Sequence, residues 1–299
     1  MRDDNRNNNI RDDNNRNDND RNNNNRNDNI RFEGAVDYIA SKELKSAVNA
    51  AITLGRPILI KGEPGTGKTM LAGSIAAGLG LDLIVWSIKS TTKAKEGLYI
   101  YDTVQRLYDS QFGEVGVADI ARYIHLGKLG EAFTSDTPAV LLIDEIDKAD
   151  IEFPNDLLWE LDMMHFYIPE TRETIAANHV PIVVITSNAE KELPDAFLRR
   201  CVFHYIEFPD RAMMQEIVGV HFPGLDERLA RSAIDAFYRL REVKGLMKKP
   251  GTGELLDWIK VLQKERIGPD TIGREIPLLG VLIKKDEDTA VVRKKLAEK

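Results

Sequence analysis

The sequence predicts an α/β fold in which a parallel sheet is covered by helices on both faces and is followed by a small all-helical domain. Three observations predict this architecture. Apolar segments with strand character alternate with helical segments from residue 41 to residue 208, which is typical of repeated β–α units. Two of these segments, 140–143 and 182–185, are continuously apolar, as strands buried on both faces must be. After Asp210 the strand pattern stops and apolar residues recur at helical spacing.

The individual elements follow in chain order. We expect helices over 41–54 and 68–79, on either side of the first strand. The strands are expected at 57–61, 83–86, 140–143, 182–186 and 203–208. The core face of a later helix is predicted from the spacing of Leu229, Ala233, Phe237 and Leu240. Residues 284–299 are highly charged, which predicts a solvated terminal helix.

Composition divides the chain into three segments. Residues 1–30 consist of Asn, Asp and Arg apart from Met1, Ile10 and Ile30, so they are predicted to be a disordered low-complexity tail. Arginine recurs there every five residues, and expansion of a short coding repeat explains this period better than nucleic-acid binding does. Residues 31–209 are expected to form the α/β domain, and residues 210–299 the helical domain with the charged terminal helix.

Charge and composition argue against several classes of protein. The 299 residues are 42% hydrophobic, which is ordinary for a soluble protein, and their net charge of −7 makes nucleic acid an unlikely ligand, because its binders need a basic surface. The single cysteine, Cys201, cannot form an internal disulfide. The chain lacks an apolar run that could span a bilayer and a signal-peptide core, so we expect a cytoplasmic protein with no membrane partner.

A glycine-rich loop after the first strand carries the clearest chemical signal. It follows the apolar residues 58–60 and opens a helical stretch of small residues, which is the context of a phosphate-binding P-loop. Its glycines let backbone N–H groups surround the phosphates, its lysine can reach the β- and γ-phosphate oxygens, and its last threonine can bind Mg²⁺. The predicted nucleotide-binding residues are Gly62, Glu63, Pro64, Gly65, Thr66, Gly67, Lys68 and Thr69.

Two acidic residues directly after the strand at 140–143 are candidates for the chemistry of hydrolysis. A carboxylate at the C-terminal end of a buried parallel strand lies beside a bound nucleotide. We therefore predict that Asp144 holds Mg²⁺ and that Glu145 polarises the attacking water. Three charged residues follow, and they are interpreted as the capped, solvated start of a helix: Asp147, Lys148 and Asp150.

Polar residues further along complete the predicted site. Asn188 follows the strand at 182–186 and is predicted to orient the water against the γ-phosphate, although asparagine after a strand is usually a turn residue. About ten residues later, a short helix within 193–201 carries Arg199 and Arg200. One of these arginines could reach the γ-phosphate of a neighbouring subunit as an arginine finger, whereas paired surface arginines usually form solvated salt bridges.

Four motifs, GEPGTGKT, LLIDEIDKAD, ITSN and LPDAFLRRC, occur in this order. Together they resemble an AAA+ ATPase of the MoxR family, most closely its branch that is similar to the carbon monoxide dehydrogenase accessory ATPase CoxD. The resemblance covers about residues 31–265. It implies that residues 62–69 are the Walker A motif, Asp144 and Glu145 the Walker B pair, Asn188 sensor 1, and Arg200 the arginine finger with Arg199 in reserve.

Two further segments resemble this family. Residues 87–113 are rich in polar and aromatic side chains where members carry an insertion in helix 2, and residues 165–175 are interpreted as a hairpin that matches the pre-sensor 1 insertion. In the family both insertions face the ring pore or the substrate. Phe166 and Tyr167 are therefore candidates for substrate contact, with a place in the core of the hairpin as the alternative.

One segment departs from the family pattern. Members often place a sensor 2 arginine in the helical lid, but the corresponding residues 250–255 contain no arginine. Either the lid responds less strongly to nucleotide, or Lys248 or Lys249 takes that role.

The resemblance also implies the function and its partners. The leading interpretation is a Mg²⁺-dependent ATPase that assembles into a homo-oligomeric ring, usually a hexamer in this family. It would use ATP to remodel or mature a client enzyme, together with a von Willebrand factor A domain protein. The preference for ATP over GTP rests on the resemblance, because no residue in the sequence identifies the base of the nucleotide and a related branch uses GTP.

Two other classes of function remain as alternatives. A nucleotide-gated assembly switch with little turnover would not need Glu145 beside the Mg²⁺ carboxylate. A nucleic-acid motor or clamp-loader-like protein would match the Arg-Cys pair at 200–201, but the acidic net charge argues against it.

Overall fold

The central feature of the computed structural model, which describes residues 30–36, 38–113, 115–188 and 190–297, is a five-stranded sheet. Its strand order is β2-β5-β8-β1-β9, and all four neighbouring pairs are parallel. The strands are β1 (Ile58–Gly62), β2 (Asp82–Ser87), β5 (Ala139–Asp144), β8 (Ile182–Ser187) and β9 (Val202–Ile206). Because parallel strands end at the same edge, the loops after β1, β5 and β8 meet there.

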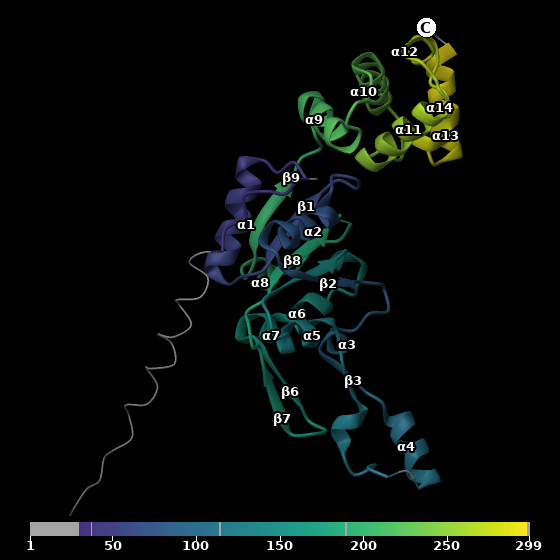
Figure 1. Ribbon diagram of the computed structural model, residues 1–299. Helices are drawn as coiled ribbons and strands as arrows, with labels where there is room; N and C mark the ends of the chain where they lie inside the picture. Colours follow the sequence, from purple (N-terminus) through teal and green to yellow (C-terminus); the bar gives the residue numbers. More distant parts are fainter. Residues whose placement is uncertain (1–29, 37, 114, 189, 298–299) are drawn as a thin grey trace, which may run out of the picture.

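Helices cover both faces of this sheet, as Figure 1 shows. They are α1 (Lys42–Leu54), α2 (Lys68–Leu79), α3 (Ala94–Leu98), α5 (Lys128–Thr134), α6 (Phe153–Asp156), α7 (Leu158–Met163) and α8 (Asp195–Leu198). On one face, α1 and α2 bury Ile60 and Leu142. On the other face, the remaining five helices of this set share a core with Leu59 and Leu141. Neighbouring strand residues thus enter opposite cores, which explains the continuous apolar runs in the sequence.

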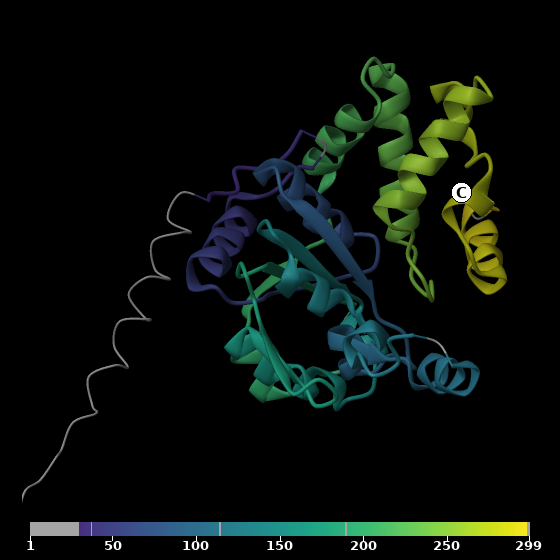
Figure 2. The same cartoon turned by 60° about the horizontal axis from the view of Figure 1, so that its bottom comes forward.

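Two small antiparallel sheets extend from this body. In the first, β3 (Tyr99–Tyr101) pairs with β4 (Ile124–Leu126), with α4 (Thr103–Phe112) and η1 (Ile120–Tyr123) between them. In the second, β6 (His165–Ile168) pairs with β7 (Glu173–Ala176), which is the hairpin predicted at 165–175. Figures 1 and 2 show α4 standing apart from the central sheet.

A contact between aromatic and acidic side chains joins the start of the first extension to the hairpin of the second. Tyr99 donates a hydrogen bond of 2.8 Å from its hydroxyl to Glu170, and its ring stacks on that of Phe166. Phe166 is 2% exposed and belongs to the core, whereas its neighbour Tyr167 is 53% exposed. The two aromatic residues therefore have different environments, because successive side chains of a strand point to opposite faces.

The chain after β9 is helical and forms a second core of its own. We call this part the lid. Its helices are α9 (Arg211–His221), α10 (Glu227–Arg241), α11 (Thr252–Lys264), α12 (Pro269–Arg274), α13 (Leu279–Leu282) and α14 (Asp286–Ala297). All four residues of the predicted core face, Leu229, Ala233, Phe237 and Leu240, are buried on α10. In Figure 1 the lid lies at the end of the molecule opposite to α4.

The terminal helix differs from the solvated helix predicted over 284–299. In α14, Val292 is fully buried and Asp288 is 1% exposed. The Asp288 carboxylate accepts the backbone N–H groups of Met247 and Lys248 at 2.7 and 3.0 Å. These donors lie in the loop before α11, and the buried carboxylate needs donors in place of water, so Asp288 joins α14 to this loop of the lid.

The predicted tail lies outside the described residues, apart from Ile30. Within the described part of the chain, no helix is both long enough and apolar enough to cross a membrane.

Candidate active site

The P-loop forms the turn between β1 and α2. Gly65 and Gly67 have φ angles of +81° and +84°, in the left-handed region that glycine adopts without strain. A Cβ on Gly62 would lie 2.6 Å from the carbonyl oxygen of Ile206, so β9 leaves no room for a side chain there. The loop ends at Lys68, where α2 begins with unpaired N–H groups at its first turn. Backbone N–H groups gathered in this way bind anions.

Lys68 is largely buried beneath this loop, with 7% of its surface exposed. Its Nζ donates hydrogen bonds of 2.9 Å to two carbonyl oxygens of the loop, and an ammonium has a third donor that can reach a phosphate. Burial lowers the pKa of Lys68, while Asp147, Asp144 and Glu145 oppose that shift. A phosphate in the loop would favour the charged lysine in the same way, because it adds negative charge.

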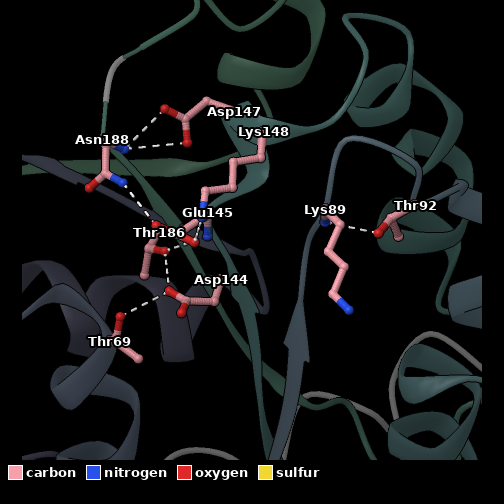
Figure 3. Close-up of polar contacts among 9 residues, drawn as sticks. All are labelled: Thr69, Lys89, Thr92, Asp144, Glu145, Asp147, Lys148, Thr186 and Asn188. Atoms are coloured by element: carbon pink, nitrogen blue, oxygen red, sulfur yellow. Dashed lines mark hydrogen bonds and ion pairs between the residues drawn. The ribbon is translucent and has the colours of Figure 1, made fainter.

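Oxygen atoms of Thr69 and Asp144 meet where the sequence predicts Mg²⁺. Thr69 Oγ1 donates to Asp144 Oδ1 at 3.0 Å, and Thr186 Oγ1 donates to the same oxygen at 2.6 Å (Figure 3). Hydroxyl and carboxylate oxygens fit Mg²⁺, which usually keeps several waters and takes further ligands from the nucleotide. The described residues contain no group of three or more His, Cys, Asp or Glu side chains that could hold a metal alone. These residues therefore fit an ion that arrives with the nucleotide.

Glu145 follows β5 in an unusual backbone conformation. Its φ of +59° lies in the left-handed region, which costs a non-glycine residue of order 1–3 kcal/mol. Its N–H donates to Thr186 Oγ1 at 2.8 Å, which helps to hold this turn. Figure 3 shows that its carboxylate accepts a hydrogen bond of 3.2 Å from Asn188 Nδ2 and pairs with Lys148. The structure thus brings Glu145 and Asn188 together, and their roles in hydrolysis stay predictions.

Asp147 differs from its predicted position at a solvated helix start. It lies in η2 (Ile146–Lys148) and is 2% exposed. Its carboxylate accepts the backbone N–H of Asn188 at 3.1 and 3.3 Å and that of Glu190 at 2.9 Å. It therefore fixes the loop that carries Asn188. The local sequence gives no sign of this role, because the bonded residues lie 41 and 43 positions away.

Replacing Asp147 with alanine is expected to lower the free energy of unfolding by about 2–3 kcal/mol, since two backbone donors lose a charged acceptor. It should also lower kcat for ATP, because Asn188 loses its support, and raise KM, because Lys68 loses a nearby negative charge that favours its charged form. Urea unfolding and steady-state kinetics measure the two effects. The control is Asp150→Ala, which removes an exposed acid three residues away. An equal response of the two variants would contradict the prediction.

The P-loop and the Walker B turn form one wall of a pocket of about 790 Å³. The other walls come from the segment before α1, the end of β9 and the lid helices α9 and α11. Pockets for small molecules and cofactors typically measure about 300–1,000 Å³, so a nucleotide fits this one. The apolar side chains in those other walls include Ile39, Ile206, Met213, Ile217 and Leu256.

Arg199 and Arg200 lie at the N-terminal end of the parallel strands, whereas the P-loop lies at their C-terminal end. They precede β9, whose first residue Val202 pairs with Ile58, whereas the P-loop follows the opposite end of β1. Arg200 pairs with Asp162, and both side chains are about 40% exposed. The sheet therefore separates both arginines from the P-loop pocket of their own chain.

A lid arginine that the motifs do not reveal reaches the P-loop. Arg241, the last residue of α10, donates to Glu63 at 2.8 Å and to the carbonyl oxygen of Pro250 at 2.6 Å. Its guanidinium carbon lies 3.3 Å from the centre of the Phe208 ring. The two lysines before Pro250, which the sequence offered as substitutes for sensor 2, are exposed.

Comparison with known proteins gives the family. The model of the ATPase family associated with various cellular activities (AAA) matches residues 58–210 of the 299. The chain belongs to this AAA family. The matched segment contains the P-loop, Asp144, Glu145, Asn188 and Arg200, and membership of this family supports ATP hydrolysis. That hydrolysis takes place in the pocket described above stays a prediction.

This AAA ATPase is also similar to the ATP-dependent zinc metalloprotease FtsH of Ureaplasma parvum serovar 3 (strain ATCC 27815 / 27 / NCTC 11736). The two are 25% identical over 189 residues. The match covers 62% of this chain and 23% of FtsH, so the chain spans less than a quarter of that relative's length.

Proposed function

We propose that this AAA ATPase is of the MoxR type. It would form a ring and use ATP binding and hydrolysis, with Mg²⁺, to remodel or mature a partner protein in the cytoplasm. The observation that carries the proposal is the insertion between β2 and β5, which presents apolar side chains to solvent away from the nucleotide pocket. The motif resemblance implies an insertion and a hairpin in these two parts of the chain, and this agreement supports the proposal.

Helix α4 of the insertion supports a role in partner contact. Every residue of α4 is at least partly exposed. Its apolar residues Val104, Leu107, Tyr108 and Phe112 are between 56% and 78% exposed. They share one helix face, because they lie at positions i, i+3, i+4 and i+8. Exposed apolar surface of this kind marks protein contact sites. The exposed Tyr167 lies on the hairpin that the insertion contacts through Tyr99 and Glu170.

The position of Arg200 supports assembly into a ring. Its own pocket lies beyond the sheet, so an arginine finger at this position would act on the nucleotide of a neighbouring subunit. Its ion pair with Asp162 is about 40% exposed, and such pairs contribute only about 0.2–1 kcal/mol, so Arg200 could leave it for a phosphate at little cost. A hexamer, ATP rather than GTP, a von Willebrand factor A domain partner and a client enzyme complete the proposal on the strength of the motif resemblance.

A nucleotide-gated assembly switch is the second candidate. The contacts of Glu145 favour it, because Lys148 and Asn188 both engage the carboxylate that should activate water. In such a switch these contacts would persist with nucleotide bound, and turnover would be slow.

The test measures phosphate release per subunit across protein concentration, while mass photometry follows assembly in the same samples. Activity that rises as rings form, and that DNA does not change, supports the MoxR-type proposal. Assembly with ATP but negligible turnover at every concentration favours the switch. Stimulation by single-stranded or duplex DNA that disappears at high salt would overturn both in favour of a nucleic-acid motor.

A further inference from the structure

We propose that Arg241 is a positioning residue for the nucleotide: it latches the lid onto the P-loop and so holds the pocket in its ATP-binding shape. The latch consists of the Arg241–Glu63 ion pair and the backbone contact between Gly65 and Gly251 with Thr252. The proposal rests on the ATPase activity of the family alone. It is independent of ring formation, of the client and of the partner proposed above.

Arg241 joins three separate segments. Its side chain is 10% exposed and pairs with Glu63 of the P-loop at 2.8 Å. It also donates to the Pro250 carbonyl in the loop before α11, and it stacks on Phe208 in the segment between β9 and the lid. A buried guanidinium needs hydrogen-bond acceptors in place of water, because burying an unpaired charge is costly. Its planar group has five N–H donors and can bind several partners at once. A side chain with these contacts holds the lid, the connecting segment and the P-loop in one arrangement.

The second part of the latch is a contact between backbones. The N–H of Thr252 donates to the carbonyl oxygen of Gly65 at 3.2 Å. A Cβ on Gly65 would lie 2.9 Å from the Cα of Gly251, so only glycine allows this approach. In a trans peptide the C=O and the following N–H point in opposite directions. The lid bond to Gly65 therefore fixes the direction of the Thr66 N–H, which is one of the donors that the loop offers to phosphates.

The latch acts on binding more than on the chemical step. Met213, Ile217, Thr252 and Leu256 of the lid line the nucleotide pocket, so release of the lid removes one of its walls. The two acids and Asn188 lie after β5 and β8, at the C-terminal end of the sheet. Asp144 accepts hydrogen bonds from Thr69 and Thr186, and Glu145 accepts one from Asn188, all within the α/β domain. Loss of the latch should therefore raise KM for ATP and leave kcat nearly unchanged.

This role differs from that of a lid arginine that contacts the γ-phosphate. The charge of Arg241 meets the Glu63 carboxylate and a backbone carbonyl, both protein groups. A γ-phosphate sensor would lose kcat on substitution, because its contact strengthens in the transition state. The division of the effect between KM and kcat thus separates the two roles.

The first experiment is a double-substitution cycle on the full chain. Arg241→Gln and Glu63→Gln are each expected to raise KM for ATP by about 5- to 150-fold, the range of a typical coupling between sites, with kcat within a factor of about two. The double variant should be no worse than Arg241→Gln alone, because Glu63→Gln removes a contact that Arg241→Gln has already lost. Arg239→Gln, which removes an exposed charge from the same helix, should change neither constant. The proposal would be overturned if the fold increases in KM of the two single variants multiplied in the double variant, or if the substitutions lowered kcat alone.

A second variant tests the backbone contact without changing charge. Gly251 has a φ of −95°, which alanine adopts freely. An alanine Cβ would lie 3.0 Å from Glu254 Oε2, which is the end of a flexible side chain, and 3.1 Å from Gly65 Cα and 3.3 Å from the Pro64 oxygen, which are backbone atoms. Gly251→Ala should therefore push the lid from the P-loop and raise KM in the same way. Gly219→Ala, with open space around its Cβ on α9, is the matched lid control. An unchanged KM for Gly251→Ala would contradict this part of the latch.

A measurement without nucleotide keeps the proposal testable if Arg241→Gln fails to fold. Spin labels are placed at the exposed positions Arg56 and Lys264, one on the body and one on the lid, with Cys201→Ser as background. Glu63→Gln leaves every lid residue in place and should broaden the distance distribution between the labels. An unchanged distribution in this variant would show that the ion pair does not position the lid.

Discussion

Replacing Glu145 with glutamine is expected to reduce ATP hydrolysis by about 10²- to 10⁴-fold, which is the range that general-base catalysis contributes. ATP binding should be retained, because the P-loop, Thr69 and Asp144 are unchanged. Glutamine keeps the size of the side chain and a carbonyl oxygen that can still accept the Asn188 hydrogen bond. It loses the negative charge that takes a proton from water. The left-handed turn and its bond to Thr186 involve only the backbone of residue 145 and should survive.

Phosphate release and equilibrium binding of a fluorescent ATP analogue measure these two effects on the same preparation. Glu152→Gln is the matched control, since it makes the same change at an exposed acid shortly after the Walker B turn. Hydrolysis by Glu145→Gln at a rate close to that of the original protein would show that another group activates the water.

Replacing Arg200 with alanine is expected to reduce hydrolysis by about 10³- to 10⁵-fold, the size of the effect of an arginine finger. Mixing this variant with Glu145→Gln should restore activity, although each is inactive alone. In a randomly mixed ring, about a quarter of the sites combine an intact Glu145 with an intact Arg200 from the neighbour. The physical reason is the position of Arg200 at the sheet edge opposite to the P-loop of its own chain.

The same assay distinguishes Arg199 from Arg200. Arg199→Ala mixed with Glu145→Gln provides the comparison, because it removes the same charge one position earlier. If ATP hydrolysis recovers in the mixture of Arg199→Ala with Glu145→Gln, and Arg200→Ala is highly active by itself, then Arg199 is the arginine finger. No recovery in either mixture would contradict a finger shared between subunits.

The local parts of the site could be predicted from the sequence because their signals are local. Eight consecutive residues, Gly62 to Thr69, contain both the glycines and the lysine of the P-loop. Asp144 and Glu145 follow a strand whose apolar run is itself a clear pattern, and neighbouring parallel strands bring such loop residues to one edge. The helix α2 begins and ends at the residues expected from this pattern.

Residues whose partners are distant in the chain could not be predicted. Asp147 has the sequence of a helix cap, yet it is buried against a loop 41 residues away. Asp288 lies in a highly charged segment that predicts a solvated helix, yet it holds a loop 40 residues before it. Arg241 lies 178 residues from Glu63 and has no motif around it. Their roles follow from burial of backbone donors and charges, and burial depends on which segments meet.

The sequence by itself determined the parallel α/β architecture, the P-loop and the acids after β5, because hydrophobic period and motif spacing act over a few residues. Only the tertiary structure decided that Phe166 is core while Tyr167 is exposed, that both finger candidates lie away from their own pocket, and that the lid reaches the P-loop through Arg241. These properties arise from contacts between segments far apart in the chain. Such contacts form when the two cores assemble, and no local pattern encodes them.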